Sequence, residues 1–367
     1  MRTPSVFAAL GCTLLALNAP AVRAQVPAKY KLTIQKGLDW LARHQNPRTG
    51  HWEGTNGQYP VSMTGLAGMA LLSEGSTARA GKYSKHIRRA RDWLMAQAQA
   101  NGLISNPREQ GQGVRYMYGH GFALLFLSCV VGEEENAARR KKLTEVCERA
   151  CKFSRDAQTN RGGWGYVSAK DGSNFDEGSV TITQIQGLRA ARNAGIKVPP
   201  EAIKDAVKYL TDSTGSDGGV RYSLAQGGGG PGKPALTAAA VCCGFAAGEY
   251  DSPLVKKWLT FCQQHIPTLG VGARIGHDEY THYYYAQAVY ALGEDGWGKL
   301  FPESKSADRV TWRKYREAAF DGLVRTQQTD GSWSGTNWTA SFGQVYVTAV
   351  FLTVLQLDNN ALPIYQK

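Results

Sequence analysis

Residues 36–52 read KGLDWLARHQNPRTGHW and carry the pattern that decides the fold. An aromatic–leucine pair at 40–41 closes an amphipathic segment, and Gln45 precedes a turn that contains Gly50 and Trp52. Glycine permits a sharp turn after a helix, a glutamine amide can satisfy backbone groups at the helix end, and tryptophan can cover the turn with a large apolar plate. The stretch therefore predicts a helix that ends in a tight turn under a buried aromatic side chain.

The same pattern recurs along the chain, most clearly in two further copies. One copy has Gln327, Gly331 and Trp333 after Asp321-Gly322-Leu323, and another has Gln158, Gly162 and Trp164 after Phe153. Weaker copies follow the pairs at 93–94, 209–210 and 258–259. We expect Trp52, Trp164 and Trp333 to be buried staples between neighbouring repeats, because a structural role explains their spacing better than a catalytic one.

Amphipathic segments alternate with segments that are apolar nearly all round. The amphipathic set, with apolar residues three and four apart, covers 30–45, 84–100, 136–158, 201–211, 253–265 and 311–328. The apolar set, rich in small residues, covers 61–73, 116–131, 179–193, 234–249, 280–292 and 342–357. Such alternation predicts an outer and an inner ring of helices, that is, an all-α fold in which six hairpins close an α/α barrel, or α/α toroid. We expect residues 25–367 to form it as a single domain.

The N-terminal residues 1–24 are typical of an export signal. Arg2 precedes an apolar run from Val6 to Leu17, and Val22-Arg23-Ala24 offers a cleavage site that would leave Gln25 as the mature start. The sequence therefore predicts an exported protein, periplasmic or secreted, with no integral span in the mature chain; an uncleaved anchor is the alternative.

Composition and charge are those of an ordinary globular protein. The 367 residues are 43% hydrophobic and 20% charged, with a net charge of +12. The basic residues are spread along the chain, and the run 139–142 follows the acidic run 133–135, as on a solvated helix face. We therefore expect no nucleic-acid partner, and the sequence does not indicate an oligomeric state.

The repeated pattern of residues 36–52 resembles the QW repeat of squalene and other triterpene cyclases. Protein prenyltransferase β subunits carry a related form, and the resemblance to this terpenoid cyclase/protein prenyltransferase superfamily spans most of residues 30–357. It implies an α/α toroid and, as a ligand, an isoprenoid or another apolar molecule. It leaves open whether the chain is an enzyme.

The acid motif of the cyclases has only a partial counterpart. No Asp-x-Asp-Asp occurs in the chain, and the nearest match is Asp176-Glu177, directly before the third inner helix. Adjacent carboxyls can raise one another's pKa and keep one protonated as an acid. The alternative is that one of them caps the helix and complements its dipole.

The zinc set of the prenyltransferases is incomplete. His282 lies where their histidine ligand would fall, but 234–244 offers Cys242 and Cys243 and no aspartate. Catalytic zinc usually has three protein ligands. We therefore predict no metal site and no cofactor, and place His282 with Asp176 and Glu177 as the candidate catalytic group.

Aromatic and amide side chains crowd the inner helices and predict an aromatic central cavity that could stabilise cations or stack ligands. The candidates are Tyr116, Tyr118, His120, Gln184, Tyr280, Tyr283, Tyr284 and Gln287. The alternative is ordinary core filling with paired hydroxyls.

Three functions follow from these features. The chain could cyclise or bind an isoprenoid in the cavity, it could bind a protein or polymer without chemistry, or it could be a polysaccharide lyase or hydrolase, since such enzymes also use α/α toroids. The last would need carboxylates or a base such as Asp176, Glu177, Asp278, Glu279 or Arg274 to converge.

Overall fold

The computed structural model describes residues 26–106, 115–172, 174–225, 227, 230–267 and 277–365. The predicted signal segment and Arg274 lie outside these residues. Within them the regular secondary structure is helical, and two isolated β-bridges, Ala98–Ile104 and Thr214–Val220, lie in the connections.

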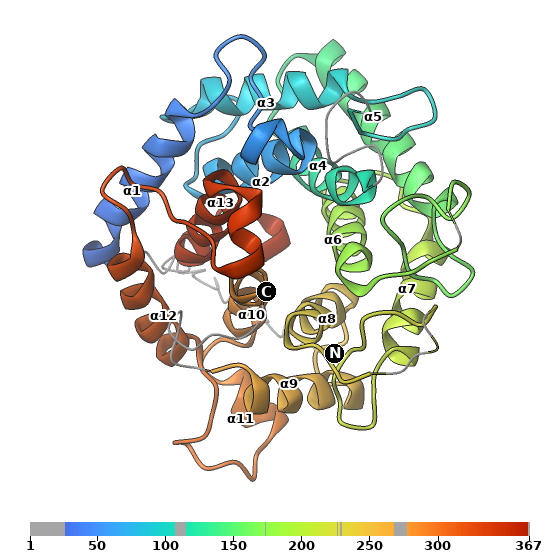
Figure 1. The fold of residues 1–367 in the computed structure, drawn as a ribbon, viewed down its shortest axis with the longest axis vertical. Coiled ribbons are helices and arrows are strands. Elements are labelled where there is room, and N and C mark those ends of the chain that lie inside the picture. Colours follow the sequence, from blue (N-terminus) through green and yellow to red (C-terminus); the bar gives the residue numbers. More distant parts are fainter. Residues whose placement is uncertain are drawn as a thin grey trace, which may run out of the picture.

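Two concentric rings of helices form the molecule (Figure 1). The outer ring consists of α1 (Ala28–Arg43), α3 (Ser84–Ala96), α5 (Ala137–Asp156), α7 (Pro200–Asp212), α9 (Pro253–His265) and α12 (Trp312–Thr326). The inner ring consists of α2 (Pro60–Ser73), α4 (Tyr116–Val131), α6 (Gly178–Asn193), α8 (Pro234–Ala247), α10 (Asp278–Leu292) and α13 (Gln344–Leu355). Short helices lie in the connections and after α13: η1 (Thr55–Gly57), α11 (Gly296–Leu300), η2 (Asn337–Phe342), η3 (Leu357–Asn359) and η4 (Pro363–Tyr365).

The inner ring closes on itself. Each inner helix packs against the next in the order α2, α4, α6, α8, α10 and α13, and α13 returns to α2, while α1 meets both α12 and α13. The prediction of an all-α toroid of six hairpins is therefore confirmed. Burial follows the predicted alternation: every residue of α2 is buried, whereas α1 buries only one face. An inner helix has protein on both sides, so it needs apolar residues all round.

In three repeats the glutamine–tryptophan turn joins the repeat to the next one. Gln45 Nε2 donates both to Gly50 O (2.8 Å) of its own turn and to His86 O (2.9 Å) of the next outer helix. Gln158 and Gln327 make the corresponding pairs of bonds, to Ala202 O and Thr33 O of the neighbouring helices. The amide thus stitches adjacent outer helices together instead of only capping its own.

The turn glycine permits this contact. Gly162 has φ +90°, and a Cβ there would lie 2.2 Å from Asp205 O of α7. Both the left-handed conformation and the close approach of the next outer helix require glycine.

The turn tryptophan is a buried staple, as predicted. Trp52, Trp164 and Trp333 are at most 1% exposed. Each indole N–H donates to the last turn of the preceding outer helix, as Trp164 does to Ser154 O (2.6 Å), and each backbone N–H donates to a threonine of the following inner helix, as Trp164 does to Thr181 Oγ1 (3.0 Å). Each tryptophan therefore links an outer to an inner helix.

Candidate functional site

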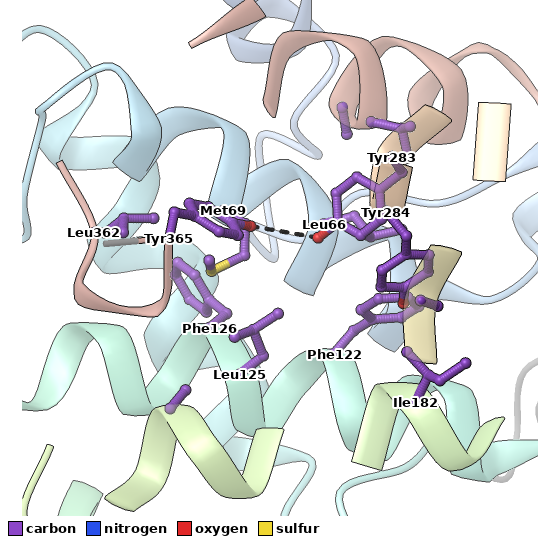
Figure 2. Close-up of a cluster of buried hydrophobic side chains, with 14 of the residues drawn as sticks. Leu66, Met69, Phe122, Leu125, Phe126, Ile182, Tyr283, Tyr284, Leu362 and Tyr365 are labelled. Carbon is purple, nitrogen blue, oxygen red and sulfur yellow. Dashed lines mark hydrogen bonds between the residues drawn. The ribbon is translucent and has the colours of Figure 1, made fainter. Parts of the chain in front are cut away.

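The interior of the barrel is filled with side chains (Figure 2). Phe122 and Phe126 of α4 and Tyr283 and Tyr284 of α10 are all buried there, together with Leu66, Met69 and Ile182. Of the two interpretations that the sequence left open for these aromatics, core filling describes Tyr283 and Tyr284.

Close approach of three inner helices narrows the barrel. A Cβ at Gly65 of α2 would lie 2.7 Å from Phe122 O of α4, and one at Gly187 of α6 would lie 2.9 Å from Gly121 O of α4. Helices that touch at glycine leave less space between them, so the rings of Phe122 and its neighbours reach across the centre.

The aromatic residues of α4 lie on two faces of the helix. Tyr116 and His120 point outward: Tyr116 OH donates to Asp171, and His120 Nε2 lies 3.0 Å from Ser154 Oγ of α5. Ile104 N donates to His120 Nδ1 (3.1 Å), so His120 occupies the place of the turn threonine in a copy without tryptophan. Burial lowers the His120 pKa to about 4, which keeps the ring neutral. Only Tyr118 faces the end of the barrel, so the expectation that all three line a cavity is corrected.

On α10 the same division holds. His282 points outward, with Nδ1 2.9 Å from Tyr315 OH of α12, and burial lowers its pKa to about 4. Tyr280 and Gln287 lie on the inner side, at opposite ends of the barrel, and bond to α6 through Ser179 O (3.1 Å) and Gln186 Nε2 (2.9 Å) respectively. His282 therefore does not face Asp176 and Glu177.

Gln184 of α6 is buried between helices. Its Nε2 donates to Met117 O of α4 (2.7 Å) and its Oε1 accepts from Ser154 Oγ of α5 (3.0 Å). Both ends of the amide are thus used in packing, away from the centre of the barrel.

Asp176 fastens a loop to the rim. Its Oδ1 accepts hydrogen bonds from Ser223 Oγ (3.1 Å), Leu224 N (2.7 Å) and Tyr209 OH (3.2 Å), and its Oδ2 lies 3.2 Å from Arg161 Nη1. A buried carboxylate with so many donors stabilises the loop that leads to α8.

Glu177 caps α6. Its carboxylate accepts from Ser179 N (3.1 Å) and Val180 N (2.9 Å), the free N–H groups of the first turn, and from Tyr118 OH (3.3 Å). The side chain is 1% exposed, and burial raises its pKa against the opposing effect of these donors. Of the two roles considered for this carboxyl, acid or helix cap, the geometry of Glu177 is that of a helix cap.

Around this cap lies a cluster that we call the tyrosine mouth, formed by Tyr118, Tyr166, Ser179, Tyr222 and Tyr280. All five are half-buried. Tyr118 OH pairs with Ser179 Oγ, Tyr166 OH pairs with Tyr222 OH, and the rings of Tyr118 and Tyr166 lie 6.0 Å apart. The cluster presents aromatic surface to solvent directly above a buried carboxylate.

Three residues of this region were not predicted from the sequence: Tyr166, Tyr222 and Arg115. The Arg115 guanidinium lies 4.7 Å from the centre of the Tyr166 ring. A signal for the two tyrosines exists in the repeat. Tyr166 follows Trp164 by two residues, and Tyr222 follows Val220, the turn residue of a copy without tryptophan, by the same step.

Two findings limit what the described residues can hold. Among them, no group of three or more His, Cys, Asp or Glu side chains could bind a metal ion. In the same part of the chain, no helix is both long and apolar enough to span a bilayer.

Comparison with known proteins agrees with this architecture. No protein-family model matches the sequence. Dammaradiene synthase from Dryopteris crassirhizoma is 28% identical over 229 residues, which cover 54% of this chain and 33% of that protein. The chain thus spans about a third of the length of this curated relative.

Solved structures extend the likeness to 90% of the chain. A variant of the type II terpene cyclase MstE from Scytonema, in complex with merosterolic acid A, superposes over 97% of its length with a TM-score of 0.58 at 15% identity. An inactive variant of an α-1,6-mannanase from a Salegentibacter species, in complex with α-1,6-mannotriose, does so over 99% with a TM-score of 0.57 at 8% identity. The predicted resemblance to the terpenoid-cyclase-like superfamily is therefore confirmed, and at these identities what is shared is the fold.

Proposed function

We propose that this protein binds an isoprenoid at the tyrosine mouth and does not cyclise it. The observation that carries the proposal is the half-buried aromatic surface of Tyr118, Tyr166, Tyr222 and Tyr280 at one end of a barrel of terpenoid-cyclase type. Flat aromatic rings contribute large apolar contact area at little entropic cost, which suits an unsaturated hydrocarbon chain.

A buried hydroxyl supports entry at this point. The ring of Tyr280 packs edge-on against Tyr284 at 4.8 Å, and the Tyr284 hydroxyl is buried with no hydrogen-bond partner in the part of the chain that the structure describes. An unpaired buried hydroxyl costs free energy that a ligand with a polar head group can recover. An isoprenoid alcohol that packs against the Tyr280 ring and reaches this hydroxyl would supply both the apolar contact and the missing partner.

The carboxyls at this end argue against proton transfer. Glu177 and Asp176 accept hydrogen bonds from backbone N–H groups and hydroxyls, and Glu279 does the same with Thr336 N (2.7 Å) and Thr339 Oγ1 (2.7 Å). Both oxygens of Glu177 accept at least two hydrogen bonds, so a proton on this carboxylate would have to replace one of them. Each carboxylate thus stabilises the rim rather than serving as an acid.

A second candidate is the binding of an oligosaccharide. Tyrosine rings stack on sugars as well as on alkenes, and the mouth offers four phenol hydroxyls. The mannanase of the same fold is in complex with mannotriose. Both ligand classes therefore belong in one experiment.

Equilibrium dialysis of the purified chain against labelled geranylgeraniol, squalene and mannotriose tests the proposal. We expect geranylgeraniol to bind, Tyr280→Phe to bind nearly as well, and Tyr280→Ala to bind about tenfold more weakly through lost contact area. Tyr250→Ala, at the opposite end of the barrel, is the matched control. Binding of mannotriose alone would favour the second candidate, and binding of none of the three would reject both.

The same incubations, analysed by mass spectrometry, test for turnover. We expect the isoprenoids to be recovered unchanged. A cyclised product that disappears with Glu177→Gln would overturn the binding-only proposal and make Glu177 the acid.

Two further parts of the proposal concern the chain as a whole. The turns are of the QW type, as the paired bonds of Gln45, Gln158 and Gln327 support.

The protein is exported after cleavage behind Ala24, and N-terminal sequencing of the mature protein should begin at Gln25.

A further inference from the structure

A recess lies at the end of the barrel opposite the tyrosine mouth, and we call it the Arg189 recess. The recess opens to solvent, and the free space of about 500 Å³ at this place includes solvent beyond its rim. Three inner helices and the C-terminal η4 line it, and the lining includes Gln186, Arg189, Cys242, Phe245, Tyr250 and Tyr365.

Arg189 gives the recess a positive charge. Its guanidinium is half-buried and forms no ion pair or hydrogen bond within the part of the chain that the structure describes. The residues that line the recess include no carboxylate. A half-buried guanidinium without a counter-charge favours a planar anion such as a carboxylate, which it can bind through two parallel N–H bonds.

Gln186 adds an acceptor that lacks a donor. Gln287 Nε2 donates to Tyr283 O (2.8 Å), which turns Gln287 Oε1 toward Gln186 Nε2 (2.9 Å). This chain of bonds fixes the Gln186 amide. Its Oε1 is buried, since the residue is only 5% exposed, and it has no hydrogen-bond partner among the described residues. Buried acceptors of this kind are expected to be paired, so the recess lacks one O–H or N–H donor.

The remaining wall is apolar. Phe245 and Tyr250 stack at 5.3 Å with an angle of 17° between their rings. Opposite them, the η4 segment brings Ile364 and Tyr365 to the recess. Tyr365 is inserted into the end of the barrel, where its hydroxyl meets that of Tyr283 (Figure 2). The wall suits a flat ring.

Cys242 does not add a reactive group. Its thiol donates to Tyr284 O (3.2 Å), and burial raises its pKa to about 12. A thiol held protonated is a poor nucleophile, so the recess is equipped for non-covalent binding.

We propose that the Arg189 recess binds a hydroxylated aromatic carboxylate. Arg189 pairs with the carboxylate, the Phe245–Tyr250 wall covers the ring, and the ligand hydroxyl donates to Gln186 Oε1. This site is separate from the tyrosine mouth, and neither depends on occupation of the other.

Isothermal titration with three probes on the intact mature chain tests the assignment: 4-hydroxybenzoate, benzoate and 4-hydroxybenzyl alcohol. Wild type should bind 4-hydroxybenzoate, bind benzoate roughly fivefold more weakly because Gln186 stays unpaired, and bind the uncharged alcohol at least about tenfold more weakly. Arg189→Met, which keeps the apolar stem, should weaken binding of both anions about tenfold. The control is Arg192→Met, because Arg192 is exposed on the same helix and does not line the recess.

Gln186→Leu tests the contribution of the ligand hydroxyl. We expect this variant to bind 4-hydroxybenzoate and benzoate equally, because the acceptor for that hydroxyl is gone. Equal affinity of wild type and Arg189→Met, or no anion binding by wild type up to roughly 10 mM, would overturn the proposal. Thermal unfolding of each variant without ligand separates lost binding from lost folding.

Discussion

The two ends of the barrel differ in how completely their charged and amide groups are satisfied. At the end with the turns, the buried carboxylates of Asp176, Glu177 and Glu279 accept bonds from backbone and hydroxyl donors. At the other end, Gln186 Oε1 is buried and unpaired, and Arg189 faces a recess without a counter-charge. At the turn end the carboxylates therefore stabilise a framework that carries an aromatic surface, whereas the opposite end has the unpaired guanidinium and amide oxygen of a polar binding site.

The largest expected effect is at the turn end. Trp164→Ala should lower the free energy of unfolding by about 3–5 kcal/mol. The substitution removes a fully buried indole, creates a cavity and leaves Ser154 O without its hydrogen-bond donor. Chemical denaturation measures this loss. Trp338→Ala is the control, since that side chain is 55% exposed and its removal should cost less than about 0.5 kcal/mol. Equal losses in both variants would contradict the staple role.

A smaller effect is expected at the opposite end. Tyr365→Ala should lower the free energy of unfolding by about 2–3 kcal/mol. The loss is smaller than for Trp164→Ala, because η4 can partly collapse into the space that the tyrosine ring leaves. Tyr365→Phe should be nearly neutral, because the bond to Tyr283 is long at 3.4 Å. Denaturation of both variants checks this, and a neutral Tyr365→Ala would mean that the C-terminal segment does not close the barrel.

The smallest effect concerns Glu177 and pH. Burial raises its folded-state pKa above the ordinary 4.5, so the folded chain holds this proton more tightly than the unfolded chain. The resulting stabilisation is fully present below the unfolded pKa and is lost as the pH rises through the folded pKa. The stability of wild type relative to Glu177→Gln should therefore increase as the pH falls from neutral toward the unfolded pKa, as denaturation at several pH values would reveal. A decrease would mean that the capping donors outweigh burial.

Much of the fold could be predicted from the sequence, because it depends on local patterns. The spacing of Gln45, Gly50 and Trp52 predicted the turn and its buried indole, and apolar residues on every side of 61–73 predicted an inner helix. The copies without tryptophan were harder to interpret. His120 suggested a cavity residue, whereas it replaces the turn threonine and accepts the bond from Ile104 N.

The candidate site was predicted only in part, because helix phase decides which side chains meet. Tyr116 and His120 are four residues apart and share the outward face of α4, while Tyr118 lies on the other face. The positions of Phe122 and Phe126 indicate which face of α4 points inward. Using them would have separated Tyr118 from Tyr116 and His120. Tyr166 and Tyr222 lie in loops, where no periodicity indicates direction.

The sequence by itself determined the ring of twelve helices, its closure through repeated turns and the superfamily that it resembles, because each of these depends on residues a few positions apart. Only the tertiary structure decided what fills the ring and where ligand-binding groups gather. Gly65 and Gly187 bring α2, α4 and α6 close enough for aromatic rings to occupy the centre. Gln186 and Gln287, 101 residues apart in the chain, meet across the barrel and leave one oxygen unpaired. Contacts of that range depend on how the closed ring packs, and local patterns do not encode them.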